Sequence, residues 1–356
     1  MKRNYVAGGA AYKPDQGWRP IFIYRRAGAG PGDLSLEAGG NNEAFGKLDY
    51  SGDYAFFRAL GRRLKYAVNG GTDFEAQRVF AGLKTDERRT GGEARIELEL
   101  FGKRREPLFG LFGKPGVTGL RLFAEGKRQT VALRRDDVTV AKQNLTTLNV
   151  GLNYLFSSSG PGYRKEASLS PQVEFGLGTG RDEPRFTLFS LTGNFREKKP
   201  WRYVIDLTGH AQLASSRTPL FELPSLSGDV IRGFRRDEAH GRGLWSLQSE
   251  LWLQVPGANR SRYKSFTRSP DDKPGLVENL FAFVRDHAWV AGFVDVGGIY
   301  KTIDAKSGLR AGPGVGLRVD YNRIILKLDW AYGLGETTAG RGHGRFYFNL
   351  TTNLPF

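Results

Sequence analysis

Hydrophobic and polar residues alternate along the chain, most clearly near its end. The even positions of the last segment carry Phe346, Phe348, Leu350, Thr352, Leu354 and Phe356, with mostly polar residues between them. Successive side chains of a β-strand point to opposite faces, so this alternation predicts a strand with one apolar and one polar face. The same pattern recurs over 245–255, 309–321 and 323–332. The last third of the chain is therefore expected to consist of strands.

Weaker forms of the pattern extend to the N-terminus. We expect strands at 4–13, 18–27, 32–39, 43–59, 62–70, 74–84, 93–103, 117–127, 145–156, 168–178, 185–196 and 201–213, with about five more after residue 242. This gives an odd total, whereas a bacterial single-chain barrel normally has an even number of strands. We therefore expect one of the N-terminal strands to be wrong and about 16 strands in all.

These strands predict an all-β, transmembrane antiparallel β-barrel that uses residues 1–356 as a single domain. No run approaches the ~20 apolar residues that a membrane helix needs. In a barrel only every second strand residue meets lipid, so a polar composition is compatible with a membrane location. A β-sandwich also contains alternating strands, but many long strands with a polar second face and no break between domains favour the barrel.

The alternation also predicts which side chains face lipid. The expected lipid-facing residues near the C-terminus are Leu326, Leu328, Trp330, Phe346 and Phe348, and those expected inside are Asp329, Asn349 and Asn353. Glycines Gly312, Gly314 and Gly316 share the inward face of their strand with Arg310 and Arg318. Inward glycines leave space for a plug or an inserted loop, although curvature of a small barrel would also explain them.

Two long connections interrupt the strands. Residues 215–242 form a loop of a length that is unusual in a compact barrel and often functional, and we expect it to enter the lumen as a lid. Residues 257–286 form a polar insert, in which a short amphipathic helix is expected near its end.

The composition narrows the function classes. The chain has a net charge of +16, but its Arg pairs are scattered and recur mostly near strand ends, which argues against a nucleic-acid partner. Cations at strand ends instead favour contact with outer-membrane lipid and the phosphates of lipopolysaccharide. The sequence contains no Cys, which excludes disulfides and thiolate metal sites. No apolar segment follows Met1, so no signal peptide is recognised in this chain.

The segment Ile231-Arg232-Gly233-Phe234 lies within the long loop. It resembles the Val/Ile-Arg-Gly-Phe/Tyr lid-loop signature of the bacterial surface antigen superfamily, which includes the barrel-assembly factor and the two-partner-secretion transporters. In that family, five strands follow the lid loop, the second with Phe-x-Asp-x-Gly, the third rich in glycine and the last ending in an aromatic residue. This chain has Phe293-Val294-Asp295-Val296-Gly297, then the glycines of 312–316, then Phe356. The specific resemblance covers roughly residues 220–356, and before that it is only architectural.

Asp295 is the expected partner of Arg232. It shares a strand face with Phe293 and Gly297 and should point into the lumen. A guanidinium binds a carboxylate through two parallel hydrogen bonds, which fixes a loop better than lysine does. The resemblance also implies that the lid-loop Arg is anchored to the inner wall, with Asp295 at the matching position and Glu250 as a second acid. The alternative is that Arg232 faces solvent on an extracellular loop.

The resemblance implies a bacterial outer-membrane protein that helps to insert or translocate polypeptides, or lipids, with a polypeptide client or partner protein and no cofactor. The C-terminal Phe356 resembles the signal read by the barrel-assembly machinery. Only three residues precede the strand expected at 4–13, so we expect no periplasmic transport-associated domain in this chain. A passive diffusion channel is one alternative function. A membrane anchor for a missing domain or partner chain is another.

No pattern typical of an enzyme stands out. The four histidines, His210, His240, His287 and His343, lack the spacing of metal ligands. The glycine-rich segments at 160–162 and 176–180 do not precede a helix as a phosphate-binding loop would. No Gly-x-Ser-x-Gly motif is present. We therefore expect no catalytic residue and no metal.

Overall fold

The structure is a computed structural model of the chain. It describes residues 4–352 except for gaps at 14–16, 30–31, 41–43, 55–63, 81–82, 105–116, 136–137, 161–162, 181, 200–201, 228–229, 236–237, 255–286, 304–306, 322–323, 338–339 and 342–343. The expected insert at 257–286 and its helix, together with His343, Asn353 and Phe356, lie outside the described residues. Within the described residues, no helix is long and apolar enough to cross a membrane.

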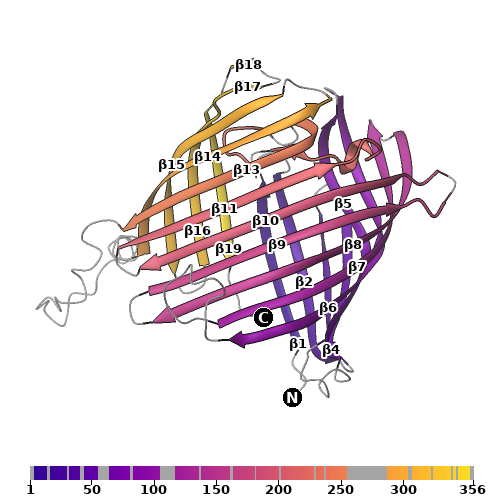
Figure 1. Cartoon of the computed structure of the whole chain (residues 1–356), viewed down its shortest axis with the longest axis horizontal. Helices are drawn as coiled ribbons and strands as arrows, with labels where there is room; N and C mark the ends of the chain where they lie inside the picture. Colours follow the sequence, from indigo (N-terminus) through magenta and orange to yellow (C-terminus); the bar gives the residue numbers. More distant parts are fainter. Residues whose placement is uncertain are drawn as a thin grey trace, which may run out of the picture.

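The described residues form long antiparallel strands (Figure 1). The first half of the chain contains β1 (Asn4–Lys13), β2 (Gly17–Ala29), β3 (Gly32–Gly40), β4 (Ala44–Tyr54), β5 (Leu64–Phe80), β6 (Leu83–Arg104), β7 (Val117–Arg135), β8 (Val138–Gly160) and β9 (Tyr163–Leu177). The second half contains β10 (Arg185–Lys199), β11 (Tyr203–Ala214), the 3-10 helix η2 (Leu220–Glu222), β12 (Ser225–Leu226), β13 (Ala239–Gln254), β14 (Ala288–Thr302), β15 (Gly308–Tyr321), β16 (Ile324–Tyr332), β17 (Glu336–Thr337), β18 (Gly340–Arg341) and β19 (Gly344–Thr352).

Each long strand pairs with the next long strand along the chain. The ladder runs from β1 through β11 to β13, β14, β15, β16 and β19. The described sheet contains 17 strands, and leaving out the two-residue β12 of the connecting loop gives the expected 16. This all-antiparallel order confirms the predicted fold class. Figure 1 shows the sheet curving around so that β1 lies behind the later strands.

The first and last strands come close to each other. Contacts between β1 and β19 are present, but among the described residues no backbone ladder joins them. The ladders on either side are regular, with every residue of β1 paired to β2 and every residue of β19 paired to β16. The contact between β1 and β19 is called the seam below.

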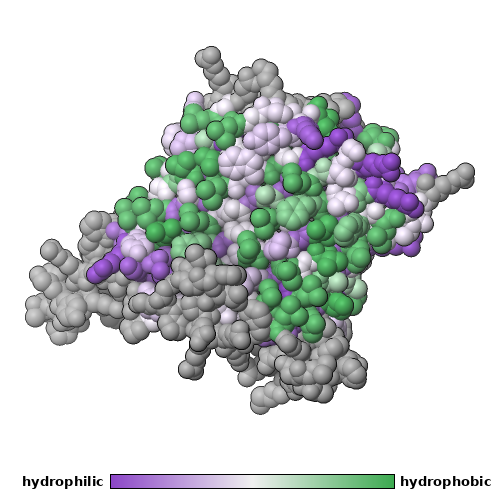
Figure 2. Space-filling model, in the orientation of Figure 1, coloured by the Kyte–Doolittle hydropathy of each residue, from purple (hydrophilic) through white to green (hydrophobic). Residues whose placement is uncertain are grey.

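The two faces of the sheet differ in polarity. Leu328, Trp330, Phe346 and Phe348 are exposed, whereas Asp329 between them is buried, so the predicted faces are confirmed at these positions. Exposed apolar side chains occur on the same face of neighbouring strands, including Leu122, Leu148, Leu251, Val290 and Val315. Figure 2 shows hydrophobic residues over much of the visible outer surface. The opposite face, called the inner face below, carries most of the charged side chains described for these strands.

Two of the expected N-terminal strands are a single strand in the structure. The segments 62–70 and 74–84 were expected to be separate strands, but β5 runs continuously from Leu64 to Phe80. The two expected strands are therefore one, which accounts for the odd total of expected strands. Gly70 and Gly71, where the first of the two expected strands ended, pair in register with Gly92 and Gly91 of β6. Because glycine lacks a side chain, it removes the alternation without ending the strand.

Several strands are also longer than the alternation indicated. β6 begins at Leu83 rather than 93, and β8 extends over Val138–Gly160 rather than 145–156. The added parts are rich in charged and hydroxyl side chains, as in Lys84 to Thr90. In β6 these polar side chains lie on both faces of the strand and give no period-two signal. In β8 the added residues include the exposed Val138 and Val140, but their alternation is too short to extend the expected strand.

Candidate functional site

The candidate site lies where the loop between β11 and β13 meets the inner face of β13 to β16. Arg232 of this loop forms two parallel hydrogen bonds with Asp295 of β14, from Nε to Oδ2 at 2.8 Å and from Nη2 to Oδ1 at 2.8 Å. The backbone N–H of Arg232 also donates to Asp295 Oδ2, at 2.9 Å. The Asp295 side chain is 0% exposed. The structure thus places the predicted pair together, with the carboxylate holding both the side chain and the backbone of the loop.

Two further carboxylates complete the surroundings of Arg232. Its Nη1 donates to Glu250 Oε2 of β13 at 2.9 Å and to Asp329 Oδ2 of β16 at 3.3 Å. Glu250 had been expected as a second acid. Asp329 had been assigned to the inner face, but not to Arg232.

A second arginine, Arg318 of β15, was not expected at the site. Its Nε donates to Glu250 Oε1 at 2.7 Å, and its Nη1 lies 2.5 Å from Asp329 Oδ1. The Arg318 side chain is 0% exposed. Two arginines therefore share three carboxylates in a buried network, and each of Glu250 and Asp329 bridges the loop arginine to the wall arginine.

The network keeps Arg232 charged. Burial opposes the charged form and would lower the pKa of Arg232, but the hydrogen bonds and negative charges of Asp295, Glu250 and Asp329 outweigh it and raise the pKa above its ordinary value. The guanidinium carbon also lies 3.5 Å from the centre of the Phe293 ring, a cation–π contact. The ring covers one face of the guanidinium while the carboxylates bind its edge.

The three inward glycines of β15 each face a different part of this assembly. A Cβ atom at Gly312 would overlap the carbonyl oxygen of Arg232. One at Gly314 would overlap the Phe293 ring, and one at Gly316 would overlap the Asp329 carboxylate. The space left by these glycines is therefore occupied by the loop, by the aromatic ring beneath it and by a carboxylate that binds it.

The remaining motif residues fit the loop against the wall. Gly233 has a φ of 99°, a conformation that favours glycine. Its N–H donates to the hydroxyl of Tyr347 on β19 at 2.8 Å, and that hydroxyl donates to the carbonyl of Phe234 at 3.2 Å. Ile231 and Phe234 are buried in an apolar cluster with Leu226, Ala239, Leu244 and Ile299. The loop is thus held by hydrogen bonds on one side and by apolar packing on the other.

The same loop has a second attachment far from the first. Arg89 of β6 donates from Nη1 to Glu222 Oε1 at 2.7 Å and from Nη2 to the carbonyl of Phe221 at 3.3 Å, and its Nε binds Glu87. Phe221 packs with Val131, Leu145, Phe186 and Leu188, which belong to β7, β8 and β10. The first attachment is on β13 to β16 and the second is on β6. Five strands, β7 to β11, separate β6 from β13 along the ladder, so the two attachments lie on different parts of the wall.

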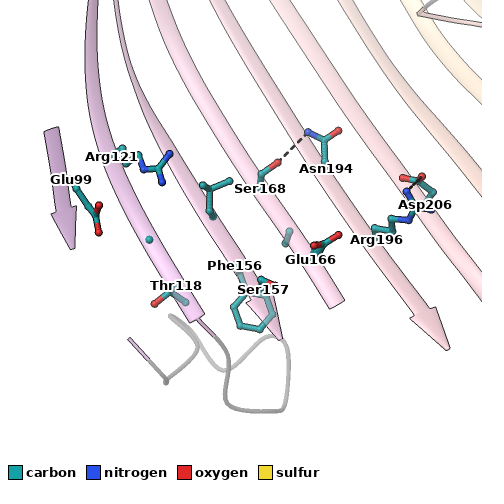
Figure 3. Close-up of a pocket in the computed structure, with 13 residues that line it drawn as sticks. Glu99, Thr118, Arg121, Phe156, Ser157, Glu166, Ser168, Asn194, Arg196 and Asp206 are labelled. Atoms are coloured by element: carbon teal, nitrogen blue, oxygen red, sulfur yellow. Dashed lines mark hydrogen bonds and ion pairs between the residues drawn. The ribbon is translucent and has the colours of Figure 1, made fainter. Parts of the chain in front are cut away.

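A cavity of about 620 Å³ lies along the inner face of β6 to β11 (Figure 3). Its charged lining residues are Glu99, Arg121, Glu166, Arg196 and Asp206. Asn194 donates to Ser168 at 3.1 Å, and Arg196 lies 3.9 Å from Asp206, as the dashed lines in Figure 3 show. Carboxylates and guanidinium groups alternate across neighbouring strands, so this wall offers both charges to a solute.

None of these clusters resembles a metal or catalytic centre. The described residues contain no group of three or more His, Cys, Asp or Glu side chains that could hold a metal ion. The acids of the Arg232 network are occupied by arginines. His210 is near Thr192, with 3.1 Å between Nδ1 and Oγ1. The arrangement supports positioning of a loop rather than bond making, and the absence of a catalytic role stays a prediction.

Comparison with solved structures gives clear matches to two kinds of barrel. BamA from Haemophilus ducreyi, in a structure lacking POTRA domains 1–3, matches with a TM-score of 0.65 at 12% identity over 99% of this chain. CdiB from Escherichia coli matches with a TM-score of 0.60 at 15% identity over 98% of the chain. CdiB from Acinetobacter baumannii gives 0.59 at 14% identity over 99%. The chain has the β-barrel fold of BamA and CdiB.

The match is one of fold and not of sequence. The chain spans 70% of the BamA structure and 62% and 59% of the two CdiB chains. Comparison with protein families and with curated proteins gives no match. The roles of the individual site residues therefore rest on the geometry of this chain.

Proposed function

We propose that this chain is a bacterial outer-membrane barrel that assists the insertion or translocation of polypeptides without chemical catalysis. The observation that carries the proposal is the buried Arg232 network, in which three wall carboxylates hold one loop arginine. Such an arrangement fixes the loop in one place on β13 to β16. The fold shared with BamA and CdiB supports the same function.

The seam between β1 and β19 provides a physical mechanism. Unpaired backbone groups at a strand edge can pair with a strand of another polypeptide. Gly8 and Gly9 of β1 add no side chains that would pack across the seam. Tyr347 ties β19 to the loop through Gly233 and Phe234, so the loop supports the β19 side of the seam, whereas among the described residues no such tie joins the loop to β1.

A passive diffusion channel is the second candidate, and the polar cavity lined by Glu99, Arg121 and Arg196 is the observation that favours it. The loop argues against a wide pore because it contacts both the β6 wall and the β14 wall. The role of membrane anchor for another domain or chain remains the third alternative. An anchor would not require the Arg232 network inside the barrel, so this network does not favour that role.

The proposed partners follow from this function. They are a polypeptide client or partner protein, outer-membrane lipid with lipopolysaccharide, and the barrel-assembly machinery that would read Phe356. These partners, and the outer-membrane location itself, belong to the proposal.

An insertion assay tests the proposal. A small eight-stranded barrel protein, kept unfolded in urea, is diluted onto liposomes that contain the folded chain, and its folding half-time is measured. We expect a severalfold shorter half-time than with liposomes that contain a diffusion porin of similar size. An unchanged half-time together with rapid efflux of small charged solutes would favour the channel instead.

A further inference from the structure

A group of cations lies on the outer face of β6 to β8, at the same end of the barrel as the loop. Arg88, Arg128 and Lys142 are all exposed. Arg88 pairs with Ala132, and Ala132 pairs with Lys142, so the two cations flank one small residue in the same row. Adjacent strands are about 4.8 Å apart, which places the Arg88 and Lys142 backbones about 10 Å apart. These three residues are called the cationic patch.

Hydroxyl and amide side chains fill the middle of the patch. Thr90, Thr130 and Asn144 occupy the row between Arg88 and Arg128. Thr130 donates to Asn144 at 2.8 Å. Gly126, the next outward residue of β7 below Arg128, leaves open space where a side chain would stand. The surface therefore offers three positive charges and several hydrogen-bonding groups around a shallow gap.

Directly below the patch the outer face becomes apolar. The next outward row contains Ala94, Gly126, Leu148 and Phe175, and the row after it contains Ile96, Ala124, Val150 and Val173. Leu148, Phe175 and Ile96 are 37%, 41% and 52% exposed. The change from cations to an uncharged band thus takes place within one row of side chains. Figure 2 shows hydrophilic residues gathered at the upper right of the visible surface, beside the hydrophobic ones.

Within the part of the chain that the structure describes, the three cations have no acidic partner. Among the described residues, no ion pair joins Arg88, Arg128 or Lys142 to a carboxylate. Described acids near the patch have other partners. Asp86 pairs across the ladder with a fourth cation, Arg134. Glu183 accepts hydrogen bonds from the backbone and hydroxyl of Thr179.

We propose that the cationic patch is a binding site for the phosphate-bearing head group of an anionic lipid, whose acyl chains lie on the apolar band below. Guanidinium and ammonium groups bind phosphate through charge-assisted hydrogen bonds. Long cationic side chains at the edge of an apolar band extend their charged ends toward the head-group region. This inference rests on the proposed membrane location but is independent of polypeptide insertion.

The ligand chemistry follows from the charge and the shape of the site. Three cations without an acidic partner favour a head group with more than one negative charge. A zwitterionic head group is disfavoured because its own positive charge is repelled by these cations. The apolar band favours a ligand with acyl chains over a free phosphate. A glycolipid that carries two phosphate monoesters meets both requirements.

Native mass spectrometry of the folded chain in detergent tests the site, with bisphosphorylated hexa-acyl lipid A as the probe. The test variant is the triple change Arg88→Gln, Arg128→Gln and Lys142→Gln. The matched control is Arg185→Gln, Arg217→Gln and Lys301→Gln, which removes the same charge from exposed positions elsewhere. We expect the test variant to bind lipid A at least about tenfold more weakly and the control within about twofold, because opposite charges in contact dominate over distant ones.

Two further probes distinguish a lipid site from a general attraction for anions. Phosphatidylcholine and inorganic pyrophosphate should each bind much more weakly than lipid A. Equal weakening in both triple variants would show that only the net charge matters and would overturn the proposal. Unchanged binding in the test variant, or pyrophosphate binding as tight as that of lipid A, would overturn it as well. Retained heat-modifiable migration on gels shows that the variants are folded, and insertion activity has no part in this measurement.

Discussion

Replacing Arg232 with alanine is expected to release the loop from the inner wall and to speed its cleavage after Arg235 by about two to four orders of magnitude. Removing one member of a buried ion-pair network costs about 3–5 kcal/mol, because the remaining charges stay buried without compensation. Here the change leaves Asp295, at 0% exposure, without its arginine. When the loop opens and closes faster than trypsin cleaves it, the cleavage rate follows the population of the open loop. The lost free energy raises this population and therefore the cleavage rate. Limited trypsin digestion of the folded protein in detergent measures it.

Asp295→Ala should have an effect of similar size, because it removes the acceptor of both the side chain and the backbone N–H of Arg232. The double variant should cost much less than the sum of the two, since residues in direct contact are not additive. Arg242→Ala is the control. Among the described residues, Arg242 donates a single hydrogen bond, to the exposed carbonyl of Ser216 at 3.0 Å, and surface changes of this kind usually stay within about 0.5 kcal/mol. Additive effects of Arg232→Ala and Asp295→Ala would show that Arg232 is held mainly by Glu250 and Asp329.

Breaking the second attachment is expected to open the barrel without destabilising the first. Arg89→Gln removes the charge that binds Glu222, and a hydrogen bond between charged groups contributes about 1.5–3 kcal/mol. Because the Arg89 and Glu222 side chains are 23% and 13% exposed, little of this is lost to solvent screening. The segment at Leu220–Glu222 should then leave the β6 wall about ten times as often or more, since 1.4 kcal/mol is a tenfold population change. Single-channel recording should show correspondingly more frequent large openings.

Arg95→Gln is the matched control for this experiment. Arg95 lies on the same inner face of β6 and binds Glu97 and Glu125 at 2.8 Å and 3.1 Å, but neither partner belongs to the loop. It therefore changes the charge of the lumen without releasing the loop. If Arg95→Gln raised the opening frequency as much as Arg89→Gln, charge alone would govern conductance. Glu222→Gln should behave as Arg89→Gln does.

The strands near the C-terminus could be predicted closely, because an apolar outer face and a polar inner face leave a strong period-two signal. The faces of Leu328 and Asp329 follow from this signal alone. Glycine-rich and polar segments carry no such signal, so β5 was divided at Gly70 and Gly71, and β6 was started too late. The strand boundaries could not be predicted in these segments, because glycine-rich and polar stretches show no alternation of hydrophobic and polar residues.

The site could be predicted only in part. The motif and the inward face of β14 suggested Arg232 and Asp295 as partners, and the glycines of β15 indicated space in front of them. Arg318 and Asp329 were placed on the inner face, but their lateral register was unknown. Gly316 pairs with Asp329 in the structure, and this register brings the β16 acid to the β15 arginine. Nothing in the sequence pointed to Arg89 and Glu222, which are 133 residues apart.

Locking the seam tests the central claim most directly. The chain has no Cys, so a cysteine in β1 (Asn4–Lys13) and one in β19 (Gly344–Thr352) can be cross-linked without background. The control disulfide joins Ala7→Cys and Ile23→Cys, which are partners in the β1–β2 ladder. If the seam opens for a client, the oxidised seam variant loses its acceleration of eight-stranded barrel insertion and regains it on reduction, while the oxidised control keeps full activity. Undiminished acceleration with the seam fully cross-linked would contradict the account.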